Sequence, residues 1–225
     1  MGIKERHERD RETVRRAILD AARDLFTSEG YRHVSIRKIA ERIEYSPAAI
    51  YSYFPSKDDI FFALAEQGFR LLGDPAGIST ALAPLERIRA IFWRLYEFSR
   101  DHPQYFELMF VDRSVPRISR EYERFAFVRE TKKHLVAEVE RGIQAGVFPR
   151  NLKPATAVRL LMVGLLGVAV LCLSERLAPG EDPDALASDI LDTTLAGLQA
   201  AVALNSKGVP LDCDAPQSMT DQRAS

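Results

Sequence analysis

Two short stretches with helical spacing, separated by a turn of only three residues, constrain the fold of this chain more than any other feature. Ser35 is placed to cap the first stretch. Ser46 can cap the second, because Pro47 then occupies the first helical position, where its missing N–H costs no hydrogen bond. The second stretch ends at Phe54, before a proline, and Ser56 can then cap a longer helix. Two short helices across such a turn form a helix-turn-helix, whose second helix enters the major groove of DNA.

The rest of the sequence also predicts helices. Strand signals are nearly absent, and apolar residues recur at helical spacing. A break rich in glycine and proline over residues 73–84 precedes longer and more apolar stretches. These stretches lie at about 116–145, 155–177 and 184–204. We expect an all-α protein with a helix-turn-helix domain at 1–60, a larger helical domain at 61–204 and a disordered tail at 205–225.

Composition and charge indicate a soluble protein. The 225 residues are 46% hydrophobic and 28% charged, as in an ordinary globular protein, and the formal net charge is −1. A site for a polyanion must therefore depend on local charge. The charged amino terminus is unlike a signal peptide. The longest apolar run, residues 160–173, is shorter than the about 20 residues that a membrane helix needs. We expect a cytoplasmic protein.

Cysteine and histidine spacing gives no sign of a disulfide framework or a metal site. Cys172 and Cys213 form no CxxC pair, and the four histidines show no HExxH or H-x3-H spacing. The sequence also contains no nucleophile elbow and no glycine-rich phosphate loop. We therefore expect no cofactor and no enzymatic activity, although carboxylates that become neighbours only in space are invisible in a sequence.

The second short helix carries the side chains that a helix in a DNA groove needs. Small residues let its backbone approach the base edges, and hydroxyl groups at its flanks can donate to phosphates. A serine at its start stands where anions are favoured, and Lys57 beyond its end can clamp one more phosphate. Taken singly, each tyrosine could be a packing residue and Lys57 a solvated charge, so the joint arrangement carries the prediction. The predicted DNA-binding residues are Ser35, Arg37, Ser46, Pro47, Ala48, Ala49, Tyr51, Tyr53 and Lys57.

The segment from about Val14 to Leu64 strongly resembles the DNA-binding region of the TetR family of transcriptional regulators. The shared pattern is A-A-x-x-L-F, then G-Y, then S-I-x-x-I-A, then S-x-x-x-I-Y-x-Y-F-x-S-K. The resemblance implies a homodimer that binds a palindromic operator and usually represses transcription until a small molecule binds the carboxy-terminal domain. It also implies that the nine residues named above lie at the DNA surface.

Two positions depart from the family pattern. The turn usually carries glycine and a small aliphatic residue, where this chain has Glu44 and Tyr45. If the glycine site has a positive φ, Glu44 costs on the order of 1 kcal/mol there. Ala49 stands where threonine or another polar residue is common, so base reading should depend more on methyl contacts, the backbone and DNA shape.

The charged amino-terminal segment, residues 4–16, allows two interpretations. Its alternating charge signs are typical of a solvated extension of the first helix. Alternatively, Arg11, Arg15 or Arg16 reaches a phosphate or the minor groove. We do not count these arginines among the predicted site residues.

Aromatic residues crowd the first helices of the second domain. At helical spacing they are typical of a filled core, but they can also line a small-molecule cavity between helices. The ligand of such a cavity should be largely apolar, and Arg113, Arg117 or Arg129 could meet an anionic end. The predicted lining residues are Phe92, Trp93, Tyr96, Phe106, Met109, Phe110 and Phe125.

The apolar run at 160–173 is hydrophobic nearly all round, so both its faces must be covered. The cover is either the rest of the monomer or a second copy, and we favour a dimer because a helix-turn-helix gains affinity by pairing half-sites. The predicted interface residues are Gly164, Gly167, Ile190, Leu191, Thr194 and Leu198.

These features predict a ligand-responsive, dimeric DNA-binding repressor. A ligand would shift the fourth helix and so change the spacing of the two reading helices from the one DNA turn, about 34–36 Å, that half-sites require. The alternative is an architectural or adaptor protein of the same fold without an effector, which would need a filled second domain.

Overall fold

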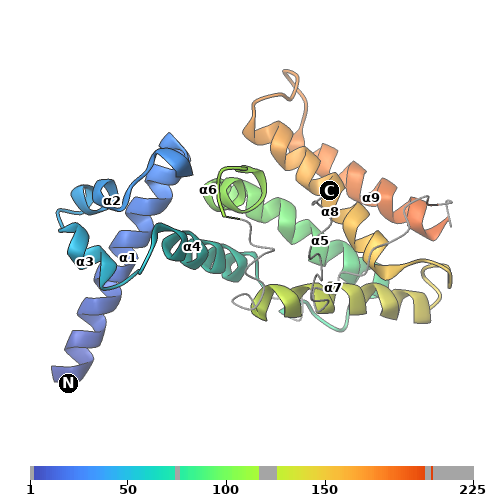
Figure 1. Cartoon of the computed structure of the whole chain (residues 1–225). Helices are drawn as coiled ribbons and strands as arrows, with labels where there is room; N and C mark the ends of the chain where they lie inside the picture. The colour runs from blue at the N-terminus through green and yellow to red at the C-terminus, as the bar shows by residue number, and fades with distance from the viewer. Residues whose placement is uncertain (1–2, 74–76, 117–125, 201–203, 205–225) are drawn as a thin grey trace, which may run out of the picture.

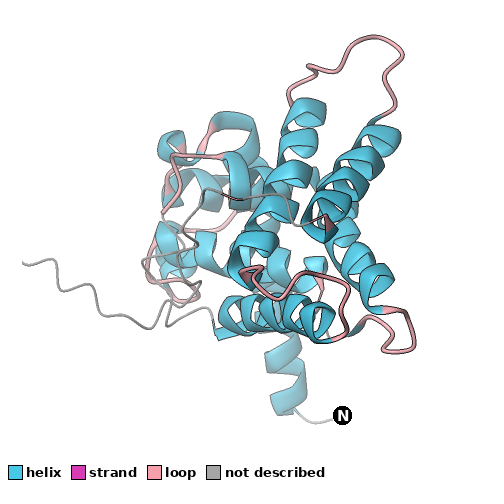
Figure 2. Ribbon diagram, turned by 90° about the vertical axis from the view of Figure 1, so that its right-hand side faces the viewer, coloured by secondary structure: helices cyan, strands magenta, loops and turns pink. Residues whose placement is uncertain are grey.

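The computed structural model describes residues 3–73, 77–116, 126–200 and Leu204. Its elements are α1 (Ile3–Glu29), η1 (Tyr31–His33), α2 (Ile36–Arg42), α3 (Pro47–Tyr51), α4 (Lys57–Leu72), α5 (Pro84–Asp101), α6 (Pro103–Phe106), η3 (Glu107–Val111), α7 (Ala126–Gln144), α8 (Pro154–Leu173) and α9 (Pro183–Gln199). Within the described residues every regular element is a helix and none is a strand (Figure 2). The expected all-α fold is confirmed. Figure 1 shows α4 joining an amino-terminal group, α1–α3, to the bundle formed by α5–α9.

The three serine caps form as expected. The Ser35 hydroxyl accepts from Lys38 N at 3.2 Å, the Ser46 hydroxyl from Ala49 N at 3.2 Å, and the Ser56 hydroxyl from Asp59 N at 3.1 Å. These bonds satisfy amide groups that the first turn of each helix leaves without a partner. The caps therefore determine where α2, α3 and α4 begin.

Three predicted helix ends need correction. α3 ends at Tyr51 rather than at Phe54. α8 ends at Leu173 rather than near residue 177, because Glu175 adopts φ 52° and the Arg176 amide turns back to the Leu171 carbonyl at 2.9 Å. α9 ends at Gln199 rather than at residue 204. Part of the stretch predicted from residue 116, and all of the predicted tail at 205–225, lie outside the described residues.

The turn between α2 and α3 contains the strained residue that the sequence suggested. Glu44 has φ 59°, in the left-handed region that favours glycine. The next amide, Tyr45 N, donates to Ala40 O at 2.9 Å and closes the end of α2. The turn therefore keeps the left-handed geometry without glycine, at a cost on the order of 1 kcal/mol.

One apolar core holds the helix-turn-helix against α1 and α4. The Tyr31 ring packs at a steep angle against the rings of Phe26 and Phe61, with centroids 5.0 and 5.9 Å away. Ile39 and Ile50, from α2 and α3, are fully buried in the same core. α3, the helix expected to read DNA, is thus held against the first residues of α4 by side-chain packing as well as by the short segment of chain that joins them.

The second core surrounds α8, which contacts α5, α7 and α9. By length and composition α8 could cross a membrane, but such helices also occur in the cores of soluble bundles, and 39% of its most apolar window is buried inside the bundle. Gly164 lets α9 approach closely, since a Cβ there would lie 2.6 Å from Ile190 Cγ2. The outer face of α8 is left exposed.

Candidate DNA-binding surface and effector cavity

α3 presents its polar face to solvent and its apolar face to the core. Ile50 and Phe54, one helical turn apart, are 0% and 4% exposed, as their spacing predicts. Tyr51 is 54% exposed, and Ala48 is exposed beside it. A short helix held from behind, with a small residue and a phenol in front, has the shape that major-groove entry requires.

The other predicted DNA-binding residues divide into outward and inward groups. Ser46, Pro47 and Ser35 are exposed, whereas Ala49 and Tyr53 are half-buried. Arg37 lies on the open face of α2, with 81% of its side chain exposed, and pairs with Glu41, its Nε 2.9 Å from Oε1. Exposed pairs of this kind are weak, so phosphate can replace the glutamate.

The structure corrects the prediction for Lys57. Its ammonium donates to the carbonyl oxygens of Tyr31 at 2.8 Å and Val34 at 2.9 Å, and lies 4.1 Å from the centroid of the Tyr31 ring. Burial lowers the pKa of this lysine below its ordinary value. Lys57 therefore fastens η1 to the start of α4 in this structure and does not point outward to a phosphate.

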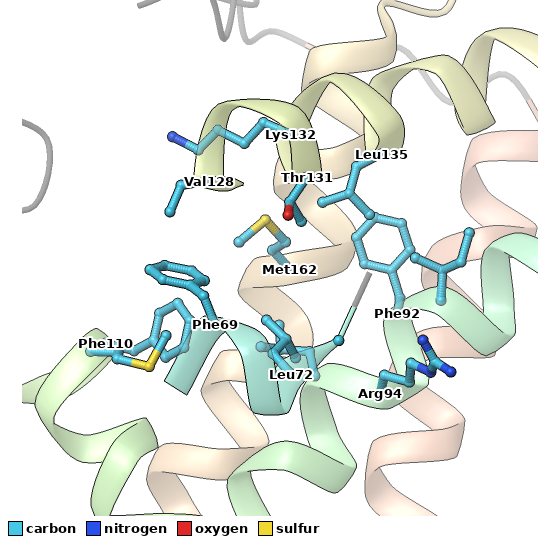
Figure 3. Close-up of a pocket in the computed structure, with 14 residues that line it drawn as sticks. Phe69, Leu72, Phe92, Arg94, Phe110, Val128, Thr131, Lys132, Leu135 and Met162 are labelled. Carbon is cyan, nitrogen blue, oxygen red and sulfur yellow. The ribbon is translucent and has the colours of Figure 1, made fainter. Parts of the chain in front are cut away.

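A cavity of about 300 Å³ lies between α4, α5, η3, α7 and α8 (Figure 3). Its wall is mostly apolar and aromatic, and it also carries the cationic side chains Arg94 and Lys132. The lining residues are Phe69, Leu72, Gly73, Ile91, Phe92, Arg94, Leu95, Met109, Phe110, Val128, Thr131, Lys132, Leu135 and Met162. This volume is at the lower end of the range for small-molecule pockets.

Three of the predicted lining residues, Phe92, Met109 and Phe110, line this cavity. Trp93 and Tyr96 do not, because they stack on each other at 5.0 Å and the Tyr96 hydroxyl donates to Asp184 on α9. Phe106 is fully buried in the core, and Phe125 lies outside the described residues. Two of the three arginines suggested for an anionic end, Arg113 and Arg129, do not line the cavity, and Arg117 is outside the described residues.

Helical spacing did not indicate that α4 contributes to the wall, nor which residues of α7 do. Phe69 and Leu72 come from the last turn of α4, and Met162 comes from α8. The α7 residues recur at helical spacing, which predicts a buried face but not which neighbour it faces. These α7 residues are Val128, Thr131, Lys132 and Leu135.

One polar atom in the cavity wall has no hydrogen-bond partner among the described residues. Thr131 Oγ1 is buried and makes no hydrogen bond with them. Figure 3 shows this side chain beside Met162, pointing into the cavity between Phe69 and Phe92. A buried hydroxyl is usually paired, so a bound molecule with a polar group would satisfy it.

Part of the wall is a π-helix. η3 closes with a bond from the Asp112 amide to the Glu107 carbonyl at 2.8 Å, which is the i to i+5 spacing. Its residues Met109 and Phe110 face the cavity. Short π-helical turns are rare and are found frequently at functional sites.

The predicted dimer residues divide into buried and exposed ones, as the predicted DNA-binding residues do. Leu191 and Leu198 are 1% and 4% exposed in the single subunit, so its own core occupies them. Ile190 and Gly164 meet each other between α8 and α9, and Thr194 is half-buried with its hydroxyl bonded to Ile190 O. Gly167 is exposed. It belongs to an apolar stripe on α8 formed by Leu160, Val163, Gly167, Val170 and Leu171.

Family models cover both parts of the chain. Residues 18–64 match the model for bacterial regulatory proteins of the tetR family, and residues 88–194 match the model for the tetracyclin repressor-like carboxy-terminal domain. The two matches together span more than half of the sequence. The chain belongs to the TetR family.

Curated relatives match over shorter stretches. The transcriptional repressor Rv1474c of Mycobacterium tuberculosis is 43% identical over 53 residues, 24% of this chain and 28% of the relative. The regulator RutR of Escherichia coli K12 is 33% identical over 91 residues, 40% of this chain and 43% of RutR. The chain thus matches less than half the length of these relatives, whose names describe regulators of transcription and not enzymes.

Solved structures share the fold over most of the chain. FadR of Bacillus subtilis, solved in complex with stearoyl-CoA, has a TM-score of 0.67 at 17% identity and covers 80% of this chain and 97% of its own. A tetR-family protein from Rhodococcus RHA1 has a TM-score of 0.64 at 22% identity, with 82% and 96% covered. At these identities the likeness concerns the fold alone.

Proposed function

We propose that this protein is a homodimeric transcriptional repressor that binds a palindromic DNA operator and leaves it when a small, largely apolar effector binds. One observation carries the proposal: α4 begins directly after the helix-turn-helix and ends in the wall of the cavity. Figure 1 shows α4 running from the amino-terminal group to the bundle, and its last turn lines the cavity, so a single helix touches both the reading unit and the candidate effector site.

In this proposal α3 enters the major groove and its neighbours hold the backbone. Ala48 and Ala49 allow close approach, and an alanine methyl can also touch a thymine methyl. Tyr51 donates its phenol proton to a phosphate, while Arg37 binds a phosphate on the α2 side. Lys57 supports these residues from behind.

The effector would act through α4. Phe69 and Leu72 belong to both α4 and the cavity wall, and Gly68 packs so tightly that a Cβ there would lie 2.2 Å from Met109 Sδ. A ligand that pushes on this wall favours a different position of α4, provided it binds the two conformations with different affinities. The spacing of the two α3 helices in the dimer then changes.

The cavity wall also indicates the chemistry of the effector. An apolar body fits among Phe69, Phe92 and Phe110, and a polar or anionic end fits Thr131 Oγ1 with the positive charge of Lys132 or Arg94. Effectors with both parts should therefore bind better than plain hydrocarbons. The cavity disfavours the architectural or adaptor alternative, which requires a filled second domain.

The dimer is proposed to form through the exposed stripe on α8. Val163 is 59% exposed at its centre, and a Cβ on Gly167 would have no atom within 4 Å. Such a stripe on a helix that is otherwise buried is best covered by the same stripe of a second copy. We therefore replace Leu191 and Leu198 by Leu160, Val163, Val170 and Leu171 in the proposed interface.

Selection from random duplex DNA at fixed moderate salt tests this function. We expect one enriched palindrome, since a symmetric dimer reads two half-sites. Tyr51→Phe removes only the phenol oxygen and should weaken binding about tenfold or more, because a hydrogen bond to a charged group contributes about 1.5–3 kcal/mol. If the folded wild-type dimer enriches no sequence, the proposed function is wrong.

A further inference from the structure

The first turns of α1 extend beyond the core of the molecule. Residues 5–13 are exposed, whereas Ile18, Leu19 and Ala22 further along the same helix are buried. Figure 1 shows this end of α1 running past α3 to the amino terminus. Since a solvated helical extension gains little from packing, the contacts that it does make are informative.

Two arginines of this extension are held against the end of the reading helix. The guanidinium of Arg11 lies 5.7 Å from the ring centroid of Tyr53, and that of Arg15 lies 5.3 Å from the ring of Phe54. Tyr53 and Phe54 lie just beyond α3, after its C-cap residue Ser52. Stacking on aromatic rings restrains each side chain, so both positive charges are already placed beside α3.

The helical register separates these arginines from the other charges of the extension. His7, Arg11 and Arg15 are spaced four residues apart and therefore share one face of α1, the face toward α3. At 3.6 residues a turn, Arg9 and Arg16 fall on the opposite face. The face of α1 toward α3 therefore carries Arg11 and Arg15, and the face away from α3 carries Arg9 and Arg16.

A groove lies between these turns and the end of α3. It has a volume of about 560 Å³ and is lined by His7, Asp10, Arg11, Val14, Ser52 and Tyr53. Its wall combines the guanidinium of Arg11 with the phenol of Tyr53, which are groups that bind phosphate oxygens, while the Ser52 hydroxyl donates to Ala49 O at 2.7 Å. Asp10 is the acidic side chain among these six, and a phosphate would therefore lie on the Arg11 and Tyr53 side.

We propose that the first turns of α1 form a second DNA contact, in which Arg11 and Arg15, with Tyr53, hold a stretch of phosphodiester backbone that α3 itself does not reach. This inference rests on the proposed DNA-binding function. It makes the operator footprint longer than the segment read by α3. The contact adds affinity and salt dependence, and adds little sequence preference, because phosphates carry no base information.

Two pairs of substitutions with equal charge changes test the proposal. Arg11→Gln with Arg15→Gln removes the two positive charges on the face of α1 toward α3. Arg9→Gln with Arg16→Gln removes two positive charges from the opposite face. Affinity for the selected operator is measured by fluorescence anisotropy over a range of salt. We expect the first pair to reduce the slope of log K against log salt by about 0.9 for every phosphate that the variant no longer neutralises, and the control pair to leave the slope unchanged.

Arg15 also packs on Phe54 and lies 4.0 Å from Glu12, so thermal unfolding of each variant is measured alongside. If the double variant is destabilised, the single Arg11→Gln change, at an exposed residue, decides the question. Equal slopes for the two pairs would overturn the inference while leaving the proposed function intact. Failure of the wild-type protein to bind any operator would instead refute the proposed function.

Discussion

The amino-terminal unit α1–α3 and the bundle α5–α9 are built from the same kind of element but use their interiors in opposite ways. In the first, Ile18, Ile39 and Ile50 are fully buried, and the candidate site lies on the outside. In the second, the helices leave a cavity of about 300 Å³, and the candidate site lies inside. A filled interior supports a rigid surface for DNA, whereas an unfilled one can respond to a ligand.

Buried polar groups show the same difference. The four buried polar or charged residues in the described part of the chain are Arg87, Ser99, Glu138 and Thr156, and all belong to the carboxy-terminal helices. Arg87 Nε and Nη2 both donate to Glu138 Oε1, at 2.9 and 2.8 Å, and join α5 to α7. The bundle around the cavity therefore contains a buried ion pair between two of its helices, and the core that holds the helix-turn-helix contains no fully buried charged residue among those described.

The largest expected effect comes from the apolar stripe on the surface of the bundle. Val163→Arg places a charge at the centre of this stripe on α8, so we expect the dimer to dissociate. Operator affinity should fall by about 10²–10⁴-fold, since linked half-sites gain that much from binding together. Sedimentation and anisotropy measure the two effects. Leu82→Arg, at a residue 38% exposed outside the stripe, is the control and should change neither.

Breaking the buried ion pair should destabilise the bundle more than any surface change. Glu138→Ala leaves the Arg87 guanidinium buried without its partner and should lower the free energy of unfolding by about 3–5 kcal/mol. Arg87→Met combined with Glu138→Leu removes both charges and should come close to wild-type stability. Chemical denaturation measures all three proteins, and an equal loss in the double variant would contradict this account.

The same pair predicts how stability depends on pH. Burial by itself would raise the pKa of Glu138, but hydrogen bonds from Arg87 and Arg141 lower it below the ordinary value of 4.5. Because the folded pKa is the lower one, the contribution is complete above the ordinary value and is lost as the pH falls through the folded pKa. The wild-type protein should lose more stability below pH 4.5 than the double variant, as denaturation at several pH values would show.

Filling the cavity tests whether the interior of the bundle is used. Met162→Trp adds a large ring in the middle of the wall shown in Figure 3. Because Met162 packs against the second core and not against the one that holds α1–α3, operator affinity should stay within about twofold, while release by the effector is lost. Measurements of operator binding with and without effector separate the two. A variant that still responds normally would place the effector elsewhere.

The smallest expected effect concerns the strained turn of the amino-terminal unit. Glu44→Gly relieves the left-handed φ of 59° and should stabilise the protein by up to about 1 kcal/mol. Glu41→Gly, a few residues earlier inside α2, should instead destabilise it by about 1 kcal/mol. Thermal unfolding compares them, and a shift of the same sign in both would show that the strain at Glu44 is absorbed elsewhere.

The two regions also differ in how far their sequences predict them. The helix-turn-helix, its three serine caps and the left-handed turn at Glu44 could all be predicted from the sequence. Each depends on interactions between residues a few positions apart. Lys57 was the exception, because its carbonyl partners at Tyr31 and Val34 lie more than twenty residues away and only the fold brings them close.

In the bundle, the sequence by itself determined that the residues form long apolar helices rich in aromatic side chains. The tertiary structure alone decided that Phe92 faces a cavity while Tyr96 faces Asp184, and that Leu191 is buried while Val163 is exposed. The physical reason is that helical spacing fixes which residues share a face, whereas the neighbour of that face depends on how separate helices pack.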